Sequence, residues 1–258
     1  MNRRTYLTTS LGAAAIGLSG CSSFTAAAAA PRPAVPEDRL ESGDWAETAD
    51  ESGTIFSNDY GPVTVEGVQH TLRYENVALR QQVADRTLGE VDTALAVFFA
   101  TRIDFSPNLD NLPGGIGRAE IIGEVRASAR DQFEAQMRNQ GLADIQTSGS
   151  GSLDIDTGET ADTDVLGAVY PFEGLVFDVT DTESVEIPPT DVDIEAVLGV
   201  WHHGDFVIVS GGAYPATNFA QTSETELSEG ITVSVDVNLG LEPERYREAV
   251  RSLVAGVE

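Results

Sequence analysis

The chain has 258 residues, with 42 acidic side chains against 15 basic ones, and all of these basic side chains are arginines. The formal net charge of −27 repels phosphate backbones and anionic head groups, which excludes nucleic acid as a partner and adsorption to lipid through a basic patch. Hydrophobic residues make up 41% of the chain, a share typical of a folded domain and not of a disordered one.

Residues 1–21 have the order of an export signal. Arg3 and Arg4 precede the apolar residues 11–18, a run too short to cross a bilayer. The paired arginines resemble a twin-arginine signal, and the Leu-Ser-Gly-Cys sequence that ends at Cys21 resembles a lipobox. We therefore expect export, with a lipid on Cys21 anchoring the protein to the outer face of the cytoplasmic membrane. The alternative is a secreted protein cut within the alanine run that follows.

The cysteine count and the acidity fit a protein outside the cytosol in brine. Cys21 is the only cysteine, so disulfides within the chain and cysteine metal sites are excluded. The acids are spread from Glu37 to Glu258, which argues against an acidic tail. In molar salt the Debye length is about 3 Å, so the mutual repulsion of these carboxylates is screened. The composition is typical of a halophilic protein.

The next residues, 22–58, are rich in Ala, Pro, Ser and acids and predict a tether, which leaves 59–258 as a single globular domain. A first strand is predicted after Gly61, and a second over residues 94–105. Helical spacing then predicts a helix over residues 118–140, ended by Gly141. In the first strand four residues share one side: Val68, His70, Leu72 and Tyr74.

The second half of the domain is mostly strand, and a helix that begins near Pro243 closes it. Helices separated by runs of strands indicate an α+β fold, and we expect an antiparallel sheet with two helices packed on one face. The predicted strands cover residues 153–156, 165–172, 175–180, 192–201, 206–213 and 231–239.

Two segments carry ligating side chains. His202 and His203, followed by Gly204 and Asp205, offer two imidazoles and a carboxylate to a metal, but their place between two strands favours a hairpin turn. His70 lies on an apolar strand face, where a hydrogen-bonded core histidine is the ordinary interpretation. Asp154 and Asp156 begin an oxygen-rich segment that runs to Asp164, which lacks the glycine and the closing glutamate of a helix-loop-helix calcium site, so a solvated loop is favoured.

Two glycine-rich segments are candidate contacts for a ligand or partner. The glycines of residues 113–117 offer backbone amides to an anion, but they match no phosphate-loop pattern, so a helix entry is favoured. The glycine-rich strand end is the second candidate for a ligand or partner contact, with a plain strand end as the alternative; its residues are Trp201, Gly211, Gly212 and Tyr214. No catalytic motif is recognised and no cofactor is expected.

The signal, the acidity and residues 196–215 together resemble haloarchaeal twin-arginine lipoproteins grouped as a family of unknown function. The order of elements is also loosely similar to photosystem-assembly and mycobacterial surface lipoproteins, without a shared motif. We expect a noncatalytic, lipid-anchored extracytoplasmic domain that binds a protein partner or small ligand at the cell surface. The alternatives are an exported metal-dependent hydrolase that uses His70, His202 or His203, and a structural cell-surface protein.

Overall fold

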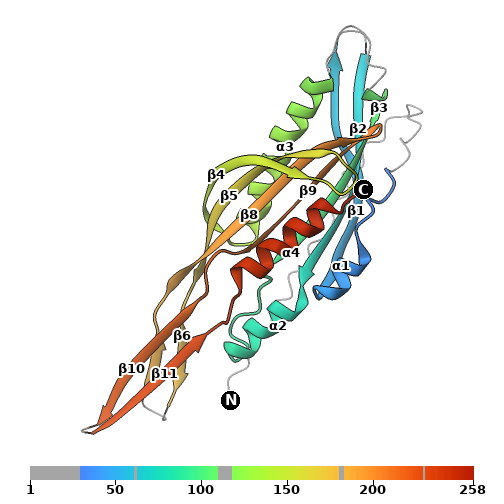
Figure 1. The fold of residues 1–258 in the computed structure, drawn as a ribbon. Helices are drawn as coiled ribbons and strands as arrows, with labels where there is room; N and C mark the ends of the chain where they lie inside the picture. Colours follow the sequence, from blue (N-terminus) through green and yellow to red (C-terminus); the bar gives the residue numbers. More distant parts are fainter. Residues whose placement is uncertain (1–29, 61–62, 110–117, 180–182, 229) are drawn as a thin grey trace, which may run out of the picture.

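The computed structural model describes residues 30–60, 63–109, 118–179, 183–228 and 230–258. The export signal with Arg3, Arg4 and Cys21, and the glycine-rich residues 113–117, lie outside these ranges. A seven-stranded antiparallel sheet forms the centre, in the order β1-β2-β3-β9-β8-β5-β4 (Figure 1). Its strands are β1 (Trp45–Tyr60), β2 (Val63–Asn76), β3 (Val97–Ser106), β4 (Ala143–Asp154), β5 (Thr160–Phe172), β8 (Thr190–His203) and β9 (Phe206–Pro215).

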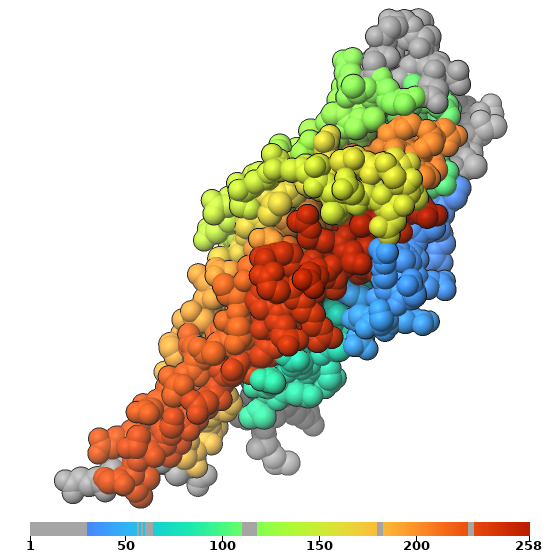
Figure 2. Space-filling model, in the orientation of Figure 1, coloured from blue at the N-terminus to red at the C-terminus, as the bar shows by residue number. Residues whose placement is uncertain are grey.

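Helices cover both faces of this sheet. On one face the ring of Phe99 in β3 lies 5.2 Å from the ring of Phe133 in α3 (Arg118–Asn139). On the other face Gly212 of β9 lies beneath Val250 of α4 (Pro243–Ala255). We call these sides the α3 face and the α4 face. Figure 2 shows α4 across the middle of its face, with the short helices α1 (Glu37–Ser42) and α2 (Val77–Arg86) to one side.

The expected α+β class and the antiparallel sheet are confirmed, but the placement of two helices on one face is wrong. Every residue of β9 is buried. A central strand that is apolar on both sides needs cover on both sides, so α3 and α4 separate to opposite faces.

The described fold begins well before residue 59. Ala30 is 3% exposed, and Ala34 exchanges two backbone hydrogen bonds with Glu258 at 2.7 and 2.9 Å. Trp45 packs edge-on against Phe98, with ring centroids 6.4 Å apart. Residues 30–58, which composition assigns to a tether, are therefore part of the globular domain, and only 22–29 lie outside the described residues.

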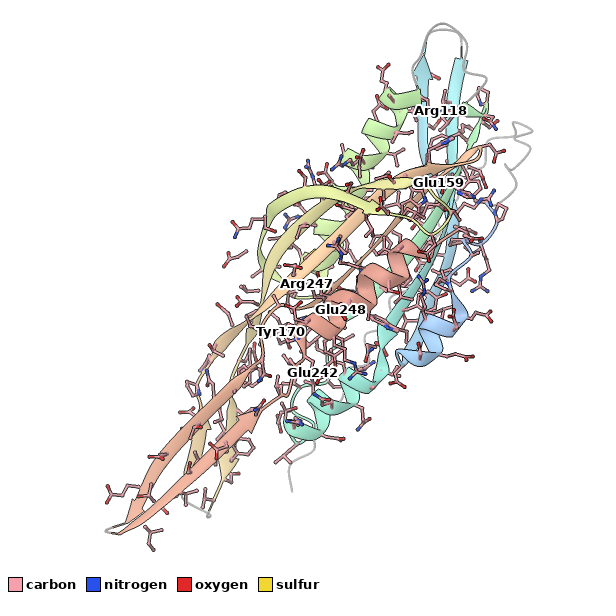
Figure 3. The ribbon with its side chains drawn as sticks, in the orientation of Figure 1. Arg118, Glu159, Tyr170, Glu242, Arg247 and Glu248 are labelled. Carbon is pink, nitrogen blue, oxygen red and sulfur yellow. The ribbon has the colours of Figure 1, made fainter. Side chains whose placement is uncertain are left out.

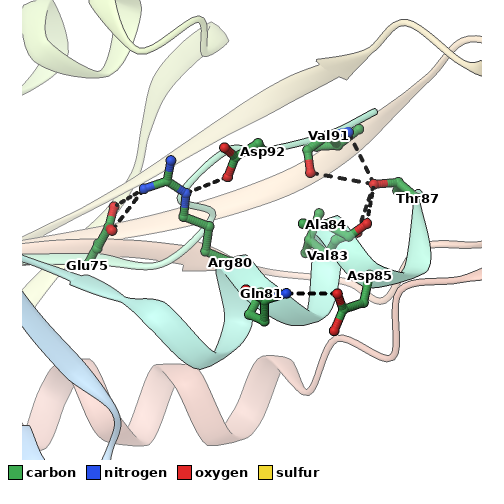
Figure 4. A network of polar contacts seen from close by, with 9 residues as sticks. All are labelled: Glu75, Arg80, Gln81, Val83, Ala84, Asp85, Thr87, Val91 and Asp92. Atoms are coloured by element: carbon green, nitrogen blue, oxygen red, sulfur yellow. Dashed lines mark hydrogen bonds and ion pairs between the residues drawn. The ribbon is translucent and has the colours of Figure 1, made fainter. Parts of the chain in front are cut away.

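Helix ends follow their local sequence. Gly141 adopts a φ of +88° just after α3, the left-handed conformation that stops a helix. The side chain of Asn76 accepts a hydrogen bond from the backbone of Leu79 and so begins α2. Figure 4 shows the surrounding network, in which Arg80 joins Glu75 at the end of β2 to Asp92 beyond the helix.

Two hairpins form an arm that extends from one end of the sheet (Figure 1). They contact each other, and the rings of Phe172 and Phe219 meet at 4.8 Å near the base of the arm. No helix among the described residues is long and apolar enough to cross a membrane. The arm consists of β6 (Leu175–Asp178), β7 (Ser184–Ile187), β10 (Ala220–Ser228) and β11 (Ile231–Asn238).

Candidate functional site

The two adjacent histidines stand at the hairpin between β8 and β9, where Gly204 has a φ of +59°. Because neighbouring strand residues point to opposite faces, His202 and His203 are separated by the sheet. His203 Nδ1 lies 2.8 Å from Glu159 Oε1, and its ring lies 5.2 Å from that of Phe206 on the α4 face. This geometry agrees with the hairpin turn that the sequence favours over a metal site at these two histidines.

His202 is the unsatisfied member of the pair. Its Nε2 is buried and has no hydrogen-bond partner among the described residues. Burial lowers the pKa of His202, and the positive charge of Arg118 lowers it further. His202 is therefore a neutral side chain near pH 7.

Of the remaining predicted ligands, His70 and Asp156 form structural contacts, whereas Asp154 is exposed. His70 lies between the Ala30 carbonyl, at 2.9 Å from Nδ1, and Asp50 Oδ1, at 2.6 Å from Nε2. The Asp156 carboxylate accepts a 2.6 Å bond from Arg39, and Asp154 ends β4. Within the described ranges no three metal-ligating side chains come together.

The glycine-rich strand end lies in the core. Trp201 is 3% exposed and Tyr214 1%. A Cβ at Gly211 would overlap the carbonyl of Val197, and one at Gly212 that of Val97. The structure therefore places all four residues in the core, and a ligand or partner contact by them stays a prediction. The hydroxyl of Tyr214 donates to Glu195, which also accepts a hydrogen bond from Arg247. Figure 3 labels Arg247 on α4.

A groove opens on the α3 face, where the helix leaves part of the sheet uncovered. Its volume is about 170 Å³, its floor is formed mainly by β2 and β3, and α3 forms one wall. Ile55 reaches it from the β-bulge between Thr54 and Phe56 in β1, a local insertion that re-aims a side chain. The lining residues are Ile55, Gln69, Thr71, Arg73, Phe99, Thr101, Ile103, Val125, Ser128, Ala129, Gln132, Phe133, Gln136 and Val209.

Two buried hydroxyls form part of the floor. Thr71 and Thr101 are register partners on β2 and β3, and their Oγ1 atoms are 2.9 Å apart. They are 8% and 6% exposed. Each hydroxyl has one hydrogen and only one of the two is used between them, so the other is left to donate. Among the residues that the structure describes, no acceptor receives it.

The helix adds an uncharged hydrogen-bonding stripe. Ser128, Gln132 and Gln136 recur every fourth residue and line the groove together. Gln132 Nε2 donates to Ser128 Oγ at 3.0 Å. The amides of Gln136 and of Gln69 across the groove have no side-chain hydrogen bond within the described part of the chain. The groove thus presents both donors and acceptors.

The lining of this groove carries no acidic side chain. None of its 14 lining residues is an Asp or Glu, although the chain has 42 of them. Arg73 is the one charged lining residue, and two of its nitrogens each lie 3.1 Å from a carboxylate oxygen of Glu51. The groove is therefore close to neutral and rich in polar groups, which suits recognition of a small uncharged molecule.

The sequence alone does not predict this site. Thr71 and Arg73 alternate with Leu72 and Tyr74, so the predicted strand has them on the side opposite to its apolar one. A usable signal was the four-residue spacing of Ser128, Gln132 and Gln136, an uncharged stripe on a helix of a highly charged chain. That stripe alone does not reveal which strands face it.

The fold and groove define a class: an antiparallel α+β domain, helix-covered on both faces, with one small polar groove beside its long helix. The chain belongs to the family described as a domain of unknown function (DUF6517), whose model matches residues 32–258. This match confirms the expected membership of a family of unknown function. No curated protein and no solved structure matches the chain.

Proposed function

We propose that this protein is a noncatalytic, lipid-anchored extracytoplasmic domain of a halophile that binds a small ligand in the groove beside α3. The observation that carries the binding role is the groove itself, a concave site without acidic residues on a chain of net charge −27. Lining it with carboxylates would add to the solubility of the protein in brine. Amides and hydroxyls there instead offer directional hydrogen bonds, as small-molecule sites do.

The proposed anchor sets how far the domain stands from the membrane. If Cys21 carries the lipid, nine residues lead from it to Ala30, the first described residue, which is already buried. At 3.3–3.6 Å per extended residue these span at most about 30 Å. The domain is therefore held close to the lipid surface, at a much shorter distance than a spacer of residues 22–58 allows.

A melting experiment with a groove-filled variant tests the binding role. The full chain is heated in 2 M KCl with neutral sugars, nucleosides, amino acids and aromatic alcohols, each tested alone. We expect at least one compound to raise the melting temperature, because a ligand that binds only the folded state stabilises it. Ser128→Phe places a ring in the groove from an exposed helix position and should abolish the rise.

Ala127→Phe is the matched control, since Ala127 is exposed on the same helix and does not line the groove. It should retain the full rise. The binding role is contradicted if every compound that stabilises the wild type stabilises Ser128→Phe equally, or if none stabilises the wild type.

A further inference from the structure

We infer that the ligand of the groove beside α3 is a neutral, polyhydroxylated six-membered ring, a single sugar unit. This inference rests on the proposed binding role and specifies its ligand. Three properties of the groove lead to it: its charge, its hydrogen-bonding groups and its size.

The charge of the groove excludes ionic ligands. An anion would meet only Arg73, whose guanidinium already forms a two-pronged contact with Glu51, within a chain of net charge −27. A cation would find no carboxylate in the lining. A charged ligand that leaves water needs a counter-charge, so a neutral molecule is the best match.

The hydrogen-bonding groups match hydroxyls in particular. A hydroxyl donates one bond and accepts others, and an amide side chain offers both functions at once. Gln69 lies on β2, whereas Gln132 and Gln136 lie on α3, so the amides face the groove from two sides. The hydrogen left over by Thr71 and Thr101 adds a donor at the floor.

The apolar lining suits the C–H groups of such a ring. Phe99, Ile103 and Val209 lie on the central strands β3 and β9, between the amides of β2 and those of α3. A pyranose ring has hydroxyls around its rim and C–H bonds on its faces. It can therefore place its C–H groups on these side chains while its hydroxyls reach the amides.

The volume sets the number of rings. The groove holds about 170 Å³, and an apolar cavity of about 150 Å³ holds one benzene ring. Sites for larger drug-sized ligands begin near 300 Å³. One sugar ring fits inside, and further rings of a glycan would extend out of the open side.

Calorimetric titration of the full chain, purified in detergent and 2 M KCl, tests the inference. The probes are methyl β-glucoside, methyl β-galactoside and N-acetylglucosamine. We expect saturable binding of at least one. Gln132→Leu, which removes an exposed amide of the lining, should weaken it about tenfold, equivalent to about 1.4 kcal/mol. Thr101→Val, which removes a floor hydroxyl at nearly constant volume, should weaken it similarly.

Gln81→Leu serves as the control, because Gln81 is an exposed helix amide of α2 outside the groove. It should bind like the wild type. Melting curves show whether Thr101→Val is folded; if it is not, Gln132→Leu decides. Equal binding by Gln132→Leu and wild type overturns the inference.

Two further results separate this inference from the proposed binding role. If none of the three sugars binds, but an aromatic alcohol or a nucleoside stabilises the wild type and not Ser128→Phe, the sugar assignment fails and the binding role stands. If no compound acts through the groove, both fail.

Discussion

At the scale of single residues, the contacts of the histidines decide their roles. The alternation of His70 with Leu72 and Tyr74 predicts that it lies on an apolar strand face, and the structure gives it two hydrogen-bond partners there. The opposite orientation of His202 and His203 follows from strand geometry alone. The partner of His203 does not, because Glu159 is 44 residues away and arrives through the turn between β4 and β5.

Burial of His202 predicts a dependence of stability on pH. Its pKa is lowered in the folded state, whereas the unfolded chain titrates near the ordinary value of about 6.5. Above about pH 7 both states are neutral and the group has no effect. As the pH falls through 6.5 the unfolded state takes up a proton that the folded state resists, so stability falls, by at most about 1.4 kcal/mol per pH unit.

Denaturant unfolding at pH 7.5 and 5.5, at one fixed high salt concentration, measures this effect. The variant His202→Gln lacks the titrating group and should lose less stability over this interval than the wild type. Glu159 and Asp92 have lowered pKa values and titrate below the interval. Equal losses of stability in the wild type and in His202→Gln would show that protonation of His202 does not cause the dependence on pH.

At the scale of elements, a strong hydrophobic periodicity is sufficient to predict a helix or strand, and a weak one is not. The long helix was predicted over 118–140 and occupies Arg118–Asn139, and the closing helix begins at Pro243 as expected. The helix α2 was missed, because only Leu79 and Val83 of its ten residues are buried. β1 is an edge strand with many polar residues, so its sequence resembles a loop.

The role of β1 and α1 leads to a prediction about where the folded domain begins. A chain that begins at residue 59 lacks Trp45 and Leu40, both at or below 9% exposure. Loss of a buried Trp or Leu side chain costs roughly 2–5 kcal/mol each, against a total stability of about 5–15 kcal/mol. We expect that chain to show no cooperative melting transition, whereas a chain from residue 30 melts like the full one.

Circular dichroism during heating in 2 M KCl distinguishes the two chains. A cooperative transition of the shorter chain within a few degrees of the longer one would mean that residues 30–58 only extend the domain and do not stabilise it.

At the scale of the whole molecule, the candidate site depends on how distant elements pack together. The groove requires four neighbouring strands, β1, β2, β3 and β9, and a helix that is distant in sequence, so no local pattern reveals its full lining. The separation of α3 and α4 to opposite faces was likewise missed, because it depends on which strands become central. The glycines thought to contact a partner became core positions for the same reason.

The proposed anchor makes a prediction for the intact protein. In cells, the wild type should fractionate with membranes in high salt and be released by detergent, because a lipid on Cys21 holds it there. Cys21→Ser should appear in the soluble fraction, while Ser22→Ala, one residue further on, should remain with membranes. Membrane association of Cys21→Ser at the wild-type level would contradict a lipid at this position.

The most direct test of the central claim is a crystal structure of the protein grown with methyl β-glucoside or whichever of the three sugar probes binds. We expect one sugar ring in the groove beside α3, with hydroxyls on Gln132 or Gln136 and C–H groups on Phe99. A sugar bound elsewhere, with the groove filled by the protein's own side chains, would contradict the assignment of this groove as the ligand site.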